Sequence, residues 1–302
     1  MKTKVSVRRI KFGGLAAVEL KTAALRLVAI TTKGPRIAYF GKADGANLLM
    51  WQPGKYFRGP WELMGGHRLW VSRPGADEAE ETYAADNQPC TVELGKNGFT
   101  LTAPVDPVLL TQRGFTVTAL AADRLHVDHF VINHSAMLWS GGLWSITCTL
   151  PGAATRYLVP LGDGSTWDYT TVIAIRTWGH DQGAKTFNDP RFEMTDDAFH
   201  LNPVSGLENK RMLKADPGIM AMHEPAQQVL FAVRAAYQPD GNYPLGTNLA
   251  LYVGPKSFMV EMETMGPFVT LKPQQTLKHA ETWVLCAAKS APTAKALEAL
   301  FA

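Results

Sequence analysis

The sequence predicts an all-β protein, a single large antiparallel β-sandwich. Short segments rich in Val, Ile, Leu, Phe and Tyr recur along the chain, and turn residues drawn from 26 glycines and 19 prolines separate them. Long helical segments do not alternate with these strands, which argues against a parallel α/β sheet. The expected strands span residues 25–30, 36–40, 124–132, 170–175, 229–234, 249–253, 258–263 and 281–286.

The C-terminal segment SAPTAKALEALFA, residues 290–302, has the one clear helical pattern in the sequence. Ser290 or Thr293 is a suitable N-cap, and Leu297 and Leu300 share one apolar face of the expected helix. The segment therefore predicts a short helix at the C-terminal end of an otherwise β protein.

Residues 176–227 mix polar residues, proline and glycine with little periodicity. Long loops on a rigid sandwich commonly carry binding groups, but the same segment also fits plain connecting structure. The chain has no repeat of fixed period and no linker that would split it. Residues 1–302 are therefore expected to form one domain.

The composition is that of a folded protein, with 302 residues, 46% of them apolar and 19% charged. No run of about 18 apolar residues predicts a membrane span, and no apolar segment of a signal peptide follows the charged start. Cys90, Cys148 and Cys286 are odd in number and far apart, which favours reduced thiols in a cytoplasmic protein. The net charge of +3 is too dispersed to indicate a nucleic-acid partner.

The segment RLHVDHFVINH contains several histidines and invites a metal hypothesis. On a strand, however, His126 and Asp128 point to one face and His129 to the other. The following His134 stands in the turn that ends the strand. Because zinc and iron sites need convergent ligands, this spacing argues against a metal site.

The segment MGGHRLW, residues 64–70, places two glycines before a histidine, an arginine and a tryptophan. The glycines allow a positive φ or a close approach to a neighbouring backbone. As a strand, the segment puts His67 on one face, and Arg68 and Trp70 on the other. As a short loop it lets all three converge on a ligand, and as a structural turn it buries Trp70 and pairs Arg68 with a carboxylate.

In the segment FMVEMETMGP, Glu261 and Glu263 lie on the same face of an expected strand. Two carboxylates on one face are costly to bury without partners. The pair is therefore either ordinary wet surface or part of a cleft in which one glutamate acts as a general base or binds a sugar hydroxyl. The sequence contains no GxSxG, no P-loop and no GxGxxG, so serine hydrolysis and nucleotide binding are not indicated.

Four segments together resemble the galactose mutarotase-like superfamily, and in particular a bacterial branch of poorly defined function with a GGHRLW motif. The segment from Met64 to Pro89 carries that motif and a Tyr-x-x-Asp-Asn motif. The other segments are PRIAYFGKADGANLLMW (35–51), VINHSAMLWSGGLWSITCTLPG (131–152) and the C-terminal section 243–286. The resemblance implies a β-supersandwich of large antiparallel sheets with a carbohydrate cleft.

The resemblance also implies site residues. Aldose epimerases of the superfamily carry their base in a Glu-Thr segment shortly before a proline, which here is Glu263, Thr264 and Pro267. A histidine beside a Gly-Gly pair lies at their cleft, which suggests His67 as the acid, although the order here is Gly-Gly-His. Their second histidine follows an asparagine, as His134 does here, but the aromatic sequence expected after it is replaced by SAMLWSGG.

The expected function is therefore aldose 1-epimerisation or a close relative. Glu263 removes the proton of the anomeric hydroxyl, an acid such as His67 protonates the ring oxygen, and the ring opens and closes again. The residues expected to hold the sugar are Arg68, Trp70, Tyr83, Asp86, Glu261 and His134.

The expected ligand is a small sugar or an oligosaccharide, and the mechanism needs no cofactor and no metal. No membrane or nucleic-acid partner is expected, and the sequence carries no signal of an oligomeric state. A non-catalytic carbohydrate-binding protein on the same fold is the alternative, because the central aromatic-histidine pattern is missing. A lyase or hydrolase of sugar polymers is a third hypothesis.

Overall fold

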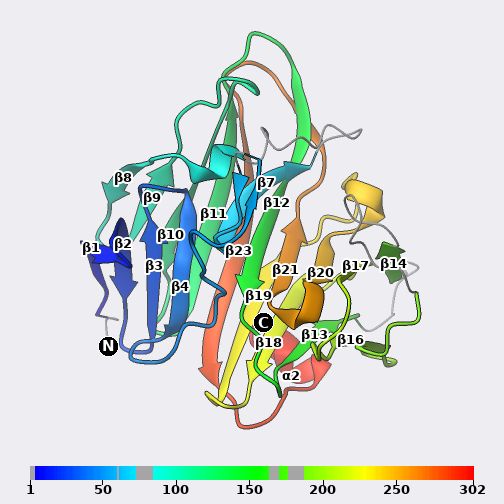
Figure 1. Ribbon diagram of the computed structural model, residues 1–302. Helices are drawn as coiled ribbons and strands as arrows, with labels where there is room; N and C mark the ends of the chain where they lie inside the picture. The colour runs from blue at the N-terminus through cyan, green and yellow to red at the C-terminus, as the bar shows by residue number, and fades with distance from the viewer. Residues whose placement is uncertain (1–3, 60, 73–83, 163–169, 176–186) are drawn as a thin grey trace.

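The computed structural model describes residues 4–59, 61–72, 84–162, 170–175 and 187–302. Within these residues the chain is mostly β-strand, as the sequence predicts, and two large antiparallel sheets pack face to face (Figure 1). The strands at 25–30 and 249–253 have the expected bounds, and the others differ by a few residues. Successive side chains of a strand point to opposite faces of its sheet. Apolar residues recur along these strands because one of the two faces lines the interior between the sheets.

The first sheet has 11 strands in the described residues, and its order is β1-β2-β3-β4-β7-β12-β21-β20-β17-β14, with β22 paired to β12. These strands are β1 (Ser6–Phe12), β2 (Leu15–Lys21), β3 (Leu25–Ile30), β4 (Arg36–Lys42), β7 (Gly66–Ser72), β12 (Trp139–Thr149), β21 (Val260–Met265), β20 (Leu249–Val253), β17 (Asn209–Lys214), β14 (Thr171–Ile175) and β22 (Val269–Leu271).

The second sheet has 10 strands in the described residues, and its order is β15-β16-β13-β18-β19-β23-β11-β10-β9-β8. They are β15 (Phe192–Met194), β16 (Ala198–Leu201), β13 (Arg156–Pro160), β18 (Ile219–Glu224), β19 (Val229–Ala235), β23 (Thr276–Ala287), β11 (Arg124–Asn133), β10 (Thr111–Ala119), β9 (Gly98–Thr102) and β8 (Thr91–Leu94). A small separate hairpin joins β5 (Phe57–Arg58) to β6 (Trp61–Glu62).

The short helical elements lie at the margins of the sheets. Among the described residues they are the 3₁₀ turns η1 (Ala84–Asn87), η2 (Pro244–Gly246) and η3 (Pro255–Ser257), and the α-helix α2 (Ala294–Ala299). Thr293 caps α2 by accepting a hydrogen bond from the amide of Ala296, and Leu297 is buried against the second sheet, as the sequence predicts. No helix among the described residues combines the length and apolar character that a membrane crossing requires.

The main core lies between the sheets and takes side chains from both, for example Phe40 and Leu251 from the first and Phe115 and Trp283 from the second. The side of the first sheet that lines this core is its inner face, and the opposite side is its outer face. Alternation along each strand sends successive side chains to the two faces. The first sheet therefore separates two environments, and its outer face has an apolar cluster of its own around Trp70 and Trp144.

Residues 187–227 contain β15, β16, β17 and β18, although the sequence of this region shows little periodicity. Their side chains explain the difference. In β17, Asn209, Lys210 and Arg211 are all buried, because hydrogen bonds and ion pairs inside the protein satisfy them. A strand whose charges are satisfied in this way does not show the apolar alternation on which the sequence argument depends.

Candidate active site on the outer face

Two glutamates of β21 lie on the outer face. Glu261 and Glu263 alternate with Met262 and Thr264, which face the core. Glu263 is 0% exposed and Glu261 is 8% exposed, so the sequence-level alternative of ordinary wet surface does not describe them. Both carboxylates are instead held by partners from other strands of the same sheet.

Glu263 is held through one of its two oxygens. Its Oε2 accepts hydrogen bonds from Lys210 Nζ at 2.7 Å and from Trp144 Nε1 at 2.8 Å. Its Oε1 is buried and has no hydrogen-bond partner among the described residues. A buried carboxylate oxygen without a donor is an uncommon arrangement, and it leaves this atom available to a ligand hydroxyl.

Several neighbours act on the proton affinity of Glu263. Burial raises the pKa of Glu263, the positive charge of Lys210 lowers it, and the negative charge of Glu261 raises it again. The net effect is a pKa above the ordinary value of a glutamate. A raised pKa brings a carboxylate closer to the proton affinity that a general base needs near neutral pH.

Glu261 pairs with Arg68 of β7. Arg68 Nη2 donates to Glu261 Oε1 at 3.0 Å, and Arg68 Nη1 lies 3.0 Å from the sulfur of Cys148. Burial together with the nearby Glu261 raises the pKa of the Cys148 thiol to about 12, even though Arg68 opposes the change, so the thiol stays protonated. Arg68 and Cys148 therefore fix the position of Glu261 beside Glu263.

Asp86 of η1 lies over the same face. Its Oδ2 accepts a hydrogen bond from Trp70 Nε1 at 2.8 Å and lies 3.0 Å from Arg36 Nη2 and 3.8 Å from Arg68 Nε. Asp86 is 1% exposed, so these charges balance one another in a dry setting. The arrangement anchors η1 to β4 and β7.

Aromatic side chains surround these charges. Trp70 packs edge to face against Trp61 and Trp144, with ring centroids 5.5 and 5.6 Å apart. The Arg68 guanidinium lies 4.5 Å from the Trp70 ring centroid, and Lys210 Nζ lies 4.7 Å from that of Trp144. Indole faces next to hydrogen-bonding charges are the combination that suits a sugar, which has apolar C–H surfaces and hydroxyls.

The structure brings five of the predicted site residues together on the outer face, namely Glu263, Glu261, Arg68, Trp70 and Asp86. Segment 66–72 is a strand, so the alternative of a loop on which His67, Arg68 and Trp70 converge is wrong. Arg68 is paired with a carboxylate, as the structural alternative predicts, and Trp70 belongs to the outer apolar cluster.

The remaining predicted residues lie elsewhere. His67 projects from the inner face of β7 into the interior between the sheets, opposite to Arg68. His134 follows β11, and its Nε2 contacts Gln112 Oε1 at 3.1 Å, away from the outer face. Tyr83 lies outside the described residues.

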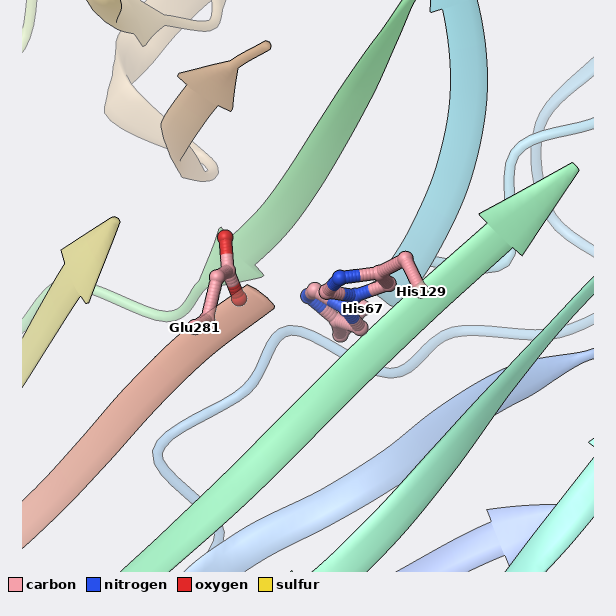
Figure 2. A group of neighbouring side chains, drawn as sticks. All are labelled: His67, His129 and Glu281. Carbon is pink, nitrogen blue, oxygen red and sulfur yellow. Dashed lines mark hydrogen bonds between the residues drawn. The ribbon is translucent and has the colours of Figure 1, made fainter. Parts of the chain in front are cut away.

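His67 belongs to a buried polar group in the interior (Figure 2). Its Nε2 lies 2.7 Å from Nε2 of His129, and its Nδ1 lies 2.9 Å from the hydroxyl of Thr147. Burial lowers the pKa of His67 to about 3, so the ring is neutral at ordinary pH. A neutral histidine on the wrong side of the sheet has no route for delivering a proton to a ligand on the outer face.

The two glycines of the GGHRLW segment have a local explanation. Gly65 and Gly66 have φ values of +83° and +73°, which side chains rarely adopt. A Cβ atom at Gly65 would lie 2.1 Å from the carbonyl oxygen of Met50, and one at Gly66 would lie 2.2 Å from that of Ile37. The glycines thus let β7 begin against two neighbouring backbones, which sets the position of Arg68 and Trp70.

Sequence reasoning missed three residues of the outer face, namely Lys210, Trp144 and Arg36. Arg36 and Trp144 stand in segments that carry the family resemblance, so strand parity relative to Arg68 and Glu263 could have placed them. Lys210 had no comparable signal, because its strand reads as polar and pairs with β20 rather than directly with β21.

No family model and no curated protein matches the chain in sequence. Its structure, by contrast, resembles many solved structures. A protein from Klebsiella pneumoniae described as a candidate aldose 1-epimerase superposes with a TM-score of 0.64 at 10% identity, over 99% of this chain and 88% of that chain. A galactose mutarotase related enzyme from Lactobacillus acidophilus superposes with a TM-score of 0.60 at 12% identity, over 95% of this chain and 100% of that chain.

A TPR-domain containing protein from Parabacteroides distasonis superposes with a TM-score of 0.62 at 14% identity, over 94% of this chain. The match covers 48% of that protein, so this chain spans about half of its length. At these identities the similarity concerns the fold. Together with the two antiparallel sheets, it confirms the resemblance at that level, and the chain has the galactose mutarotase-like fold.

Proposed function

We propose that the outer face binds a sugar and interconverts its anomers, as an aldose 1-epimerase does. The observation that carries the proposal is the state of Glu263, a buried carboxylate held through Oε2, whose Oε1 lacks a hydrogen-bond partner among the described residues. The names of the structural relatives, which include a galactose mutarotase related enzyme, support the same chemistry.

In the proposed mechanism, Oε1 of Glu263 removes the proton of the anomeric hydroxyl, the C1–O5 bond breaks, and O5 takes a proton from an acid. We assign Lys210 as this acid in place of His67, because Lys210 lies on the same face as Glu263. When Glu263 becomes neutral, Lys210 no longer has its negatively charged partner, and one of its ammonium protons can be directed to O5. The aldehyde then rotates, and ring closure returns both protons.

The sugar has to displace side chains to reach Glu263, which is 0% exposed. The outer cluster contains Met50, Met212, Met259 and Met265. Methionine side chains are flexible and adapt to different contacts, so they are suited to moving aside for a ligand. Ala250, which lies opposite Glu263 on β20, adds little bulk at this position.

A non-catalytic sugar-binding protein is the second candidate. The close Lys210–Glu263 pair favours it, because a carboxylate neutralised by an ammonium group is a weaker base. The absence of a histidine among the described groups that contact Glu263 points the same way. In either case the proposal includes a cytoplasmic location, which the three free cysteines support.

Anomer exchange measured by NMR tests the proposal, with hexoses, pentoses, 6-deoxy sugars and uronic acids as substrates. The protein is expected to accelerate exchange for at least one of them, and Glu263→Gln is expected to remove the acceleration. Glu19→Gln is the matched control, because Glu19 is a buried, arginine-paired glutamate on β2 of the same sheet. Binding without any acceleration supports the second candidate and overturns the first.

A further inference from the structure

Three side chains converge in the interior between the sheets, on the opposite side of the first sheet from the proposed sugar site. His67 of β7, His129 of β11 and Glu281 of β23 each offer one nitrogen or oxygen atom, and these atoms lie within 4.8 Å of one another. All three side chains are 0% exposed. Figure 2 shows the two imidazole rings side by side and the Glu281 carboxylate on the neighbouring strand.

Hydrogen bonds fix which ring nitrogens face each other. His129 Nδ1 lies 2.9 Å from the carbonyl oxygen of His279, which can only accept, so Nδ1 carries the hydrogen and Nε2 of a neutral ring has a lone pair. This Nε2 faces Nε2 of His67 at 2.7 Å, and the far nitrogen of His67 contacts the Thr147 hydroxyl. Metal-binding histidines are commonly oriented in this way, by an outer partner on the second nitrogen.

The charge of Glu281 is the second observation. Its oxygens accept hydrogen bonds from the hydroxyls of Ser145 and Thr264 and from Trp283 Nε1. All of these donors are neutral, and no lysine or arginine among the described residues forms an ion pair with Glu281. A buried carboxylate without a positive partner is strongly destabilising, and among the described residues the groups placed to carry or bind a positive charge beside Glu281 are His67, His129 and His279.

We propose that His67, His129 and Glu281 bind one divalent transition-metal ion, with Zn²⁺ as the best match, between the two sheets. Two imidazole nitrogens and one carboxylate oxygen form a known protein ligand set for zinc. With Zn–N bonds of about 2.1 Å, tetrahedral zinc separates two ligand nitrogens by about 3.4 Å, so the facing Nε2 atoms have to move apart by less than about 1 Å. Glu281 turns one oxygen toward the ion.

The proposed ion links β7 of the first sheet to β11 and β23 of the second. Because its three protein ligands are fully buried, the ion is incorporated while the chain folds and ties the two sheets together, and a water completes its four-coordinate shell. This inference does not depend on the sugar site, since the ligands and Glu263 lie on opposite sides of the first sheet.

The test uses the whole chain, unfolded in denaturant with a chelator and refolded with either Zn²⁺ or the chelator present. After gel filtration, elemental analysis is expected to find close to one zinc ion per chain in the first sample, and the thermal midpoint is expected to lie several degrees above that of the second. Refolding with Co²⁺ is expected to give visible absorption typical of nitrogen and oxygen ligands at low coordination number. A chain that retains no metal overturns the proposal and leaves a proton between the two rings.

A pair of variants locates the site. His129→Gln is expected to lose the metal, whereas His126→Gln, three positions earlier on β11 and on the opposite face, is expected to keep it. Equal metal content in the two variants contradicts the proposal. If His129→Gln does not fold, X-ray absorption on the zinc-loaded wild-type chain decides, because a spectrum without imidazole scattering places the ion elsewhere.

Discussion

Lys210 and Glu263 form a buried ion pair that spans β20, since β17 and β21 flank this strand on either side. Lys210 Nζ lies 2.7 Å from Glu263 Oε2, and the two side chains are 2% and 0% exposed. The pair gives the outer face a base whose charge depends on one neighbouring cation, and this dependence leads to the first prediction.

Replacing Lys210 by methionine is expected to raise the pKa of Glu263 further, because the change removes the charge that opposes burial. The unpaired carboxylate is also expected to lower the free energy of unfolding by about 3–5 kcal/mol. Denaturant unfolding measures the loss of stability, and NMR titration of the Glu263 side-chain carboxyl measures its pKa without relying on turnover. Lys214→Met on the same strand is the control, and an equal loss of stability in both variants contradicts the prediction.

The exchange rate of the wild-type protein is expected to fall on acidification at a pH above the ordinary glutamate range. A base is active when it is deprotonated, so activity is present above the pKa of Glu263 in the folded protein and is lost as the pH falls through it. Because that pKa is raised, the loss begins at higher pH than an exposed glutamate would give. A rate profile whose acidic limb sits at or below about 4.3 argues against Glu263 as the base.

The Arg68–Glu261 pair is expected to be strongly coupled. Arg68→Met leaves the buried Glu261 without its positive partner and is expected to lower the free energy of unfolding by about 3–5 kcal/mol, whereas Glu261→Gln leaves Arg68 with the more distant Asp86 and is expected to cost less. The double variant is expected to lose less than the sum of the two single losses. Denaturant titrations of the four proteins give the coupling energy, and strictly additive losses contradict the contact.

Gly66→Ala is expected to lower the free energy of unfolding by more than about 2 kcal/mol, because the new Cβ would lie 2.2 Å from the carbonyl oxygen of Ile37 at a φ of +73°. Gly54→Ala is the control, since Gly54 has a φ of +79° but open space around it. The difference between the two variants isolates the steric effect from the backbone conformation. Similar losses in both would show that close approach is not the reason for the glycine.

Much of the fold is predictable from local patterns. The strands at 25–30 and 249–253 are apolar segments bounded by turn residues, and Thr293 and Leu297 mark the C-terminal helix. The same reasoning fails for β17, whose charged residues are buried only because Glu263 and other distant groups pair with them. Partners of this kind belong to the tertiary structure and are invisible in a window of neighbouring residues.

The candidate site likewise has some features that local sequence patterns predict and others that depend on tertiary contacts. Strand parity places Arg68 and Trp70 on one face and Glu261 beside Glu263, as the sequence indicates. The metal hypothesis, however, cannot be judged from one segment. The spacing of RLHVDHFVINH indeed prevents its own histidines from converging, but His129 meets His67 and Glu281 from two other strands.

Successive side chains of β7 point alternately to the inner and the outer face of the first sheet. The number of residues in this strand therefore constrains the sequence as much as their identities do. Adding or removing one residue before His67 would turn the imidazole outward and force the Arg68 guanidinium into the dry interior, away from its outer-face partners Glu261 and Asp86. Single substitutions on one side leave the other side in place, whereas a length change disturbs both at once. Functional divergence at this strand is therefore expected to proceed by exchanging side chains and not by insertions or deletions.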